Sequence, residues 1–388
     1  MPRPQVRGSP RQKKVLRAYQ TARRHARALY NSIVLGHCWK CLNTCQHSVH
    51  FQLDLAPLPS TGTAAHATSI SGHTLILSAS QVGFKGRWYE ITAEPYIAKL
   101  SSPVQANEPG ICPTNRGRVR FLSPEDSFEP SKNRVHGLNL LPIENLCLSL
   151  RALDRLNTDT GLIGYISDVS DKTNQYNMRL LRDYKSDIHT QSLHEILQTS
   201  HSSFSTAPKP DTIELCRRDR LFLAAILASA VFQLQGSWLK QNWSSHDIQF
   251  ANILTDGYSA IKRPYLSWKV SGPSPACLSC QSPHNKATGT LLPLAISLIE
   301  LSLGGPISAL QQYGDGGLTQ IETTVKILDK VQQESGSSYS DVVKECLYWS
   351  RPGGLEFGNE KFDERFFDAV VSPLLRNFCS FEGLSYTE

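Results

Sequence analysis

Residues 220–235 read RLFLAAILASAVFQLQ, and residues 245–254, a short distance further on, read SHDIQFANIL. The first stretch is apolar on nearly every side of a helix, which is typical of a helix at the centre of a helical unit. A second such stretch, LPLAISLIELSL at 292–303, ends in Gly304-Gly305-Pro306, a combination that stops helices. Amphipathic patterns predict further helices at 321–335, 339–349 and 362–377. The second half of the chain is therefore expected to be mainly helical.

The first half of the chain shows alternation with a period of two, as half-buried strands do. This pattern predicts strands at 50–55, 72–79, 87–92, 161–167 and 176–181, and helical patterns predict helices at 11–34, 140–156 and 192–197. Residues 101–136 are rich in Pro, Gly, Asn and Ser and have no period, which indicates a long flexible insertion. We expect an α+β protein with a basic helix and a Cys/His segment at 1–49, a small β-rich lobe at 50–182 and a helical lobe at 183–388.

The composition excludes several classes of protein. The chain has 388 residues, of which 40% are hydrophobic and 19% charged, enough for a substantial core. Its longest apolar stretches, at 221–234 and 291–303, are shorter than the roughly 18–20 residues of a bilayer span, so no transmembrane segment is expected. The N-terminus lacks the apolar core of a secretory signal, and ten cysteines are too few for a disulfide scaffold of this length. We expect an intracellular protein, cytoplasmic or nuclear.

Positive charge is concentrated near the N-terminus. Residues 1–53 contain ten Lys or Arg and no Asp or Glu, although the net charge of the whole chain is only +6. Such an arm can contact an acidic partner or an anionic membrane surface, and the alternative is a solvated helix face. The nearby aromatic residues Tyr19, Tyr30 and Trp39 occupy apolar positions of the pattern, so binding of nucleic acid by stacking is not expected.

The stretch 245–254 has one chemically suggestive feature, an Asp and an Asn five residues apart. In the catalytic loop of protein kinases, an Asp and an Asn at this spacing orient the substrate hydroxyl and hold Mg²⁺. Asp247 and Asn252 match that spacing, but Gln249 stands where the loop lysine is expected. No Asp-Phe-Gly triplet follows, and no glycine-rich phosphate loop precedes the strands. Asp247 and Asn252 are therefore candidates only, and the alternative is a polar pair that caps a loop.

Two Cys-x-x-C pairs provide the other candidate site. Cys38 and Cys41 lie close to Cys45 and to three histidines, His37, His47 and His50, of which His50 is the candidate ligand, while Cys277 and Cys280 form the second pair. Thiolates at this spacing can hold one tetrahedral Zn²⁺. Cys38 and Cys41, with Cys45 or His50, are therefore candidate zinc ligands only, and we expect free or buried thiols in their place, with a redox pair as a further alternative. No G-x-S-x-G turn is present, so a hydrolase is excluded.

In these features the chain resembles an uncharacterised fungal family whose kinase-like region often follows a HeLo-type prion-inhibition and propagation domain. The resemblance runs from Leu29 to about Asn377. It is carried by the stretches 38–55, 163–166, 220–239, 243–250, 263–267, 298–304, 339–346 and 363–366. It implies a bilobal protein-kinase-like fold with degraded catalytic motifs and no demonstrated activity. Because this chain begins almost at the kinase-like region, we expect either a lone module or a truncated gene model.

Taken together, the motifs and the resemblance favour a pseudokinase-like scaffold or regulatory interaction module in signalling, with a protein partner, no cofactor and no phosphotransfer. One alternative is a residual ATP- and Mg²⁺-dependent protein kinase that uses Asp247 as base and Asn252 for magnesium. Another is a zinc-stapled adaptor without enzymatic activity.

Overall fold

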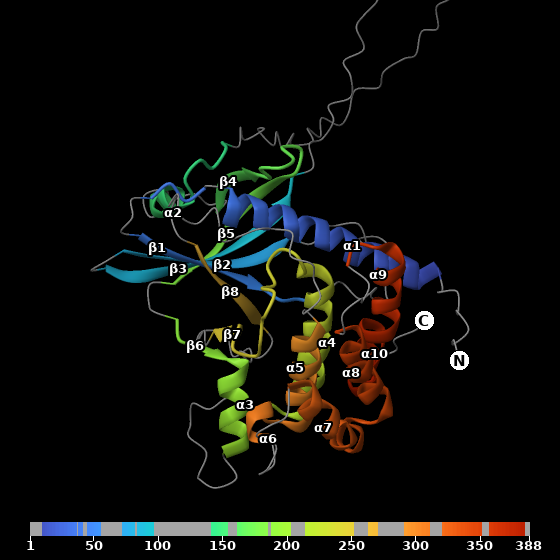
Figure 1. Cartoon of the computed structure of the whole chain (residues 1–388). Coiled ribbons are helices and arrows are strands. Elements are labelled where there is room, and N and C mark those ends of the chain that lie inside the picture. Colours follow the sequence, from blue (N-terminus) through green and yellow to red (C-terminus); the bar gives the residue numbers. More distant parts are fainter. Residues whose placement is uncertain are drawn as a thin grey trace, which may run out of the picture.

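The structure is a computed structural model that describes residues 10–36, 38–41, 45–55, 72–81, 84–96, 141–153, 161–184, 188–202, 214–251, 263–270, 291–310, 320–350 and 357–384. The protein is α+β, with one antiparallel sheet beside a group of helices (Figure 1). The described helices are α1 (Pro10–Tyr30), α2 (Leu146–Ala152), α3 (Leu193–Ser202), α4 (Arg217–Leu234), α5 (Leu291–Leu303), α6 (Ile307–Leu310), α7 (Gln320–Ser335), α8 (Ser337–Trp349), α9 (Glu360–Phe366) and α10 (Ser372–Phe381). Two π-helical turns, η1 (Asn31–Leu35) and η6 (Phe367–Val371), follow α1 and α9.

The sheet contains eight described strands in the order β4-β5-β3-β2-β1-β8-β7-β6, and every pairing between them is antiparallel. The strands are β1 (Cys45–Gln52), β2 (His73–Gln81), β3 (Phe84–Pro95), β4 (Leu162–Ser167), β5 (Gln175–Tyr184), β6 (Thr190–Ser192), β7 (Ile248–Ala251) and β8 (Pro264–Val270). The strands predicted in the first half of the chain are confirmed. The first of them differs from the prediction, because β1 begins at Cys45 rather than at residue 50.

Strand β1 lies in the interior of the sheet and joins the two halves of the chain. Its Val49 is opposite Leu77 of β2 on one side and Trp268 of β8 on the other. The sheet therefore continues past residue 182, at which the sequence predicts the lobes to divide. The additional strands β6 and β7 have only 3 and 4 residues, too few for alternation to stand out in the sequence.

The predicted central helices are confirmed. Every residue of α4 from Leu223 to Leu234 is buried, and α5 is buried at most positions. The hydroxyl of Tyr339 in α8 donates to the carbonyl of Leu298 in α5 at 2.8 Å, which fixes α8 against this pair. Helix α5 ends where Gly304 adopts a φ of 70°, a conformation that glycine adopts without strain. No helix among the described residues is long and apolar enough to cross a bilayer.

Helix α1 connects the sheet to the C-terminal helices α9 and α10, running across the molecule between them (Figure 1). Ala26, Leu29 and Ile33, on α1 and the turn after it, are fully buried. The carbonyl of Ala26 accepts a hydrogen bond of 2.8 Å from the indole of Trp238, and Tyr19 shares one of 3.0 Å with Ser229 of α4. The amphipathic helix predicted at 11–34 is thus confirmed, and it is an integral part of the core.

The helix predicted at 140–156 is wrong in its extent, since α2 begins only at Leu146. Residues 141–143 are extended and bond to Tyr165 of β4, with the amide of Ile143 donating to the Tyr165 carbonyl at 2.8 Å. Pro142 favours this extended conformation in the residue before it. The side chain of Asn145 then caps α2 by accepting from the amide of Leu148. The insertion predicted at 101–136 lies outside the described residues.

Candidate functional site

Asp247 lies in the turn between α4 and β7, where its carboxylate is held by two local groups. Its Oδ2 accepts a hydrogen bond of 3.0 Å from the amide of Ser244, while its own amide donates to the Ser244 carbonyl at 2.9 Å. The ammonium of Lys240 lies 2.5 Å from Oδ1, and the Asp247 side chain is 20% exposed. The carboxylate therefore stabilises a turn through the Ser244 amide and forms an ion pair with Lys240.

The second residue of the candidate pair, Asn252, lies outside the described residues. Strand β7 lies between the two, a strand that the sequence does not predict, and its Ile248 and Phe250 are buried in the core. Gln249, at the position where a kinase has lysine, turns its amide back to donate to the carbonyl of His246 at 2.7 Å. The described part of the loop is thus tied together by its own hydrogen bonds.

A pocket of about 580 Å³ opens beside this turn. It lies between α3, the segment before β7, α5 and α6. Its walls are formed by His194, Asn242, Trp243, Ser244, Ser245, His246, Leu292, Pro293, Ile296, Ser297, Glu300, Ile307 and Ser308. The volume falls within the range of sites for small organic molecules, and the walls combine apolar side chains with a few polar groups, as such sites do.

Glu300 and two histidines are the titratable groups in these walls. Glu300 is only 3% exposed, and its Oε1 accepts a hydrogen bond of 3.1 Å from the amide of Ile307. Burial raises the pKa of Glu300, while the Ile307 amide, the Ser245 hydroxyl and the charge of His246 act in the opposite direction. The rings of His194 and His246 are stacked at 3.8 Å, and burial followed by the charge of His246 lowers the pKa of His194. The pocket can therefore present a carboxylate and imidazoles to a ligand.

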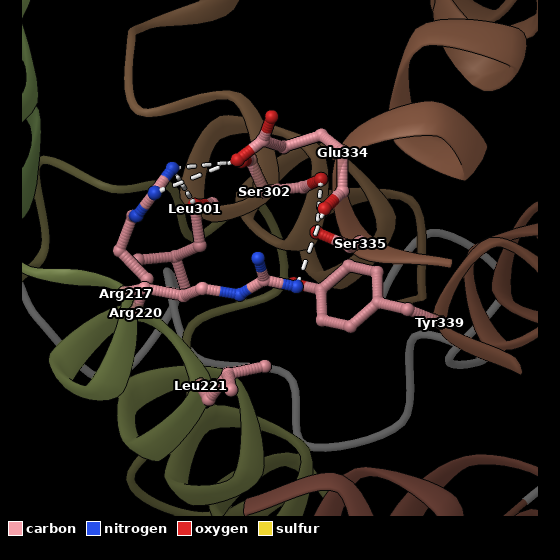
Figure 2. Close-up of a pocket in the computed structure, with 8 residues that line it drawn as sticks. All are labelled: Arg217, Arg220, Leu221, Leu301, Ser302, Glu334, Ser335 and Tyr339. Atoms are coloured by element: carbon pink, nitrogen blue, oxygen red, sulfur yellow. Dashed lines mark hydrogen bonds and ion pairs between the residues drawn. The ribbon is translucent and has the colours of Figure 1, made fainter. Parts of the chain in front are cut away.

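A second concavity, between the start of α4 and the ends of α5 and α7, is far smaller, at about 10 Å³ (Figure 2). Arg220 donates to the carbonyl of Ser302 at 2.8 Å, and its guanidinium lies 3.7 Å from the carboxylate of Glu334. The hydroxyls of Ser302 and Ser335 are 2.7 Å apart. Arginine at the carbonyl end of a helix satisfies groups that lack partners within the helix. Because the space holds about one water molecule at most, this is a structural link between helices.

The predicted zinc ligands are only partly brought together. The ligand atoms of Cys41, Cys45, His47 and Cys147 all lie within 4.8 Å of one another, and we call these four residues the cysteine–histidine cluster. The pKa of Cys41 is raised to about 12, first by burial and then by the thiols of Cys147 and Cys45.

Cys38 and His50, the other two predicted ligands, lie outside the cysteine–histidine cluster. The thiol of Cys38 donates to the carbonyl of Ile33 at 3.5 Å, and the ring of His50 stacks on Trp88 at 4.8 Å. Residues 45 and 47 of a strand share one face while residue 50 faces the other way, so the alternation of β1 separates His50 from the cluster. The second pair, Cys277 and Cys280, lies outside the described residues.

Two members of the cluster, His47 and Cys147, were not selected from the sequence. The same alternation that buries Phe51 and Val49 places His47 with Cys45, and this signal was available in the sequence. Cys147 had no such signal, because it lies in an apolar pattern and comes about a hundred residues later in the chain. It reaches the cluster through α2, whose Leu146 amide donates to the carbonyl of Cys38 at 2.7 Å.

His50 gives a testable dependence of stability on pH. Burial lowers its pKa to about 4, so the folded protein holds the ring neutral while the unfolded chain protonates it near pH 6.5. Stability is therefore lost as the pH falls from about 6.5 to about 4, by up to about 3 kcal/mol from this group. We expect His50→Gln to lose less stability than the wild type between pH 7 and about pH 4.5 in urea unfolding. Equal slopes for His50→Gln and wild type would contradict the argument.

The fold and these sites define a class: an α+β protein whose sheet is completed by strands from both halves of the chain, with a cysteine–histidine cluster on the sheet side and a pocket on the helical side. A family model described as a domain of unknown function (DUF7580) matches residues 17–379, and the chain belongs to this family. Among solved structures, the Neurospora crassa PAN3 pseudokinase is similar at 11% identity, over 92% of this chain and 69% of that chain, with a TM-score of 0.28. No curated protein matches the sequence.

Proposed function

We propose that the protein is a pseudokinase-like interaction module that does not transfer phosphate. The observation that carries the proposal is the set of contacts that the carboxylate of Asp247 makes within its own turn. A catalytic base must be free to accept or orient the hydroxyl proton of a substrate. The carboxylate of Asp247 instead accepts from the Ser244 amide and pairs with Lys240, both within its own turn. These contacts support a structural role for the residue.

The departures from kinase motifs support the same proposal. Gln249 stands in place of the lysine that neutralises the transferred phosphate, and its amide bonds to the backbone of its own loop. A module of this kind would act through a bound partner or ligand, for which the pocket offers a site of suitable size.

Incubation with ATP and Mg²⁺ tests the proposal. We expect no transfer of labelled phosphate to the protein itself or to a generic basic substrate, because the side chains of Asp247 and Gln249 are engaged in contacts within their own loop. We also expect no Mg²⁺-dependent rise in thermal stability, whereas binding at a hundredfold excess over the dissociation constant would add about 2.7 kcal/mol.

Asp247→Asn is the matched control, since it removes the carboxylate charge while keeping an oxygen for the Ser244 amide. Wild type and variant should behave alike with ATP. Phosphate transfer that requires Mg²⁺ and disappears in Asp247→Asn would establish the residual kinase in place of the module. A Mg²⁺-dependent thermal shift without transfer would make nucleotide the ligand of a non-catalytic module.

A further inference from the structure

We propose that Cys41, Cys45, His47 and Cys147 bind one structural Zn²⁺, which fastens the start of β1 to helix α2. This inference goes beyond the interaction module and does not depend on it. It also corrects the ligand set expected from the sequence, replacing Cys38 and His50 by His47 and Cys147. The observation behind it is the convergence of four ligand atoms from two distant segments within 4.8 Å of one another.

The geometry suits a tetrahedral ion. Ligands bound at the usual Zn–S and Zn–N distances are separated by about 3.5–3.8 Å along the edges of the tetrahedron. The ring Nε2 of His47 and the sulfur of Cys41 are already 3.2 Å apart. The cluster therefore needs adjustments of about 1 Å or less to surround an ion.

The types of ligand atom in the cluster favour zinc over other metals. Three thiols and one imidazole form a Cys₃His set, a recurrent combination in structural zinc sites. Soft sulfur ligands favour zinc over Mg²⁺ and Ca²⁺, which prefer oxygen. The set also leaves no ligand position for substrate once four protein atoms are bound, which is the mark of a structural rather than a catalytic site.

The surroundings of His47 favour coordination over an ordinary buried histidine. The His47 ring is 3% exposed and stacks on Trp39 at 4.5 Å with an angle of 24° between the rings. Its Nε2 contacts a sulfur, which is a weak hydrogen-bonding group, and its buried Nδ1 has no partner among the described residues. Buried polar atoms usually have a strong partner, and a metal ion bound at Nε2 would supply one to that nitrogen.

The groups around the sulfurs would stabilise the loaded site. Three thiolates and a divalent ion carry a net charge of −1, and a guanidinium nitrogen of Arg151 lies 3.8 Å from the sulfur of Cys45. The amide oxygen of Asn145 accepts from the Cys41 thiol at 3.9 Å, a contact that a metal-bound thiolate would give up, while its amide nitrogen donates to the carbonyl of Lys40 at 3.1 Å and holds the backbone beside Cys41. A guanidinium beside a sulfur is the kind of neighbour that stabilises a bound thiolate in a metal site. The ion would thus join Cys41 and the start of β1 to α2, whose capping residue Asn145 comes 104 residues after Cys41.

The test is the zinc content of the full chain, purified with a reductant and without chelator and measured by mass spectrometry of the metal. We expect about one Zn²⁺ per chain in the wild type, and a fall to near zero in Cys147→Ser. Cys38→Ser is the matched control, because it alters the neighbouring predicted thiol while leaving all four ligands, and it should retain the metal. Loss of zinc in Cys38→Ser with retention in Cys147→Ser would overturn the proposed ligand set.

A second measurement uses only wild-type protein, so it does not depend on whether Cys147→Ser folds. After removal of zinc, Co²⁺ should produce the visible absorption of a tetrahedral thiolate complex, together with its sulfur-to-metal charge-transfer band. A metal-free wild type whose cluster thiols react freely with a thiol reagent would refute the proposal. A disulfide between two cluster cysteines in protein isolated under reductant would refute it as well.

Discussion

Replacement of Trp238 by alanine is expected to lower the free energy of unfolding by about 3–5 kcal/mol, as large-to-small changes of fully buried aromatic residues do. The Trp238 side chain has no exposed surface. Its ring packs against Phe51 of β1 at 4.7 Å and against Tyr30 of α1 at 5.4 Å, and its indole nitrogen donates to the carbonyl of Ala26. The substitution would leave a cavity and an unsatisfied carbonyl where the sheet, α1 and the end of α4 meet.

Urea unfolding followed by tryptophan fluorescence and circular dichroism measures this effect. Tyr348→Ala is the control, because Tyr348 is an aromatic residue that is 61% exposed on α8. We expect it to change stability by less than about 0.5 kcal/mol. Similar losses for the two variants would show that Trp238 does not hold these elements together.

The second large effect is expected for Asp363→Ala, which should cost about 3–5 kcal/mol because it leaves a buried guanidinium without its counter-ion. Arg23 of α1 reaches both carboxylate oxygens of Asp363 in α9, the shortest contact being 2.9 Å. The two side chains are only 15% and 4% exposed. The guanidinium also donates to the carbonyl of Phe232 at 2.7 Å and lies over that ring at 4.4 Å, so it cannot leave the site easily.

The chain offers an exposed pair for comparison. Lys344 and Asp341 of α8 lie 3.4 Å apart, and their side chains are 48% and 57% exposed. Asp341→Ala should therefore change the free energy of unfolding, measured in urea, by less than about 0.5 kcal/mol. If Asp363→Ala were equally mild, the pairing of α1 with α9 would contribute little to stability.

The elements that could be predicted from the sequence are those whose signal is local. Helices α4 and α5 are apolar on all sides, and α5 carries its own stop at Gly304, so neither requires knowledge of a partner. The pairing of β1 with β8 depends on residues such as Val49 and Trp268, far apart in the sequence, and no periodicity within either strand specifies it. For that reason the sequence does not predict that strands from both halves of the chain share one sheet.

For the candidate sites as well, local features could be predicted from the sequence and contacts between distant segments could not. Asp247 was found from a local spacing, and its contacts to Ser244 and Lys240 are local as well. No local pattern marks Glu300 as a site residue, because the pocket around it is built from α3, α5, α6 and the loop before β7. Cys147 could be assigned to a cluster only once α2 had been placed beside the segment 38–41.

The position of β1 inside the sheet also determines the order in which this chain can fold. One edge of β1 can form hydrogen bonds with β2 soon after both have been synthesised. The other edge can pair only after β8, which ends at Val270, has been synthesised. Helix α1 waits longer still, since Arg23 and Asp363 are 340 residues apart. Strand β1 and helix α1 are synthesised before the segments that complete their contacts, and closure of such long loops slows folding. Until then an open strand edge is exposed, a surface on which nascent chains associate wrongly.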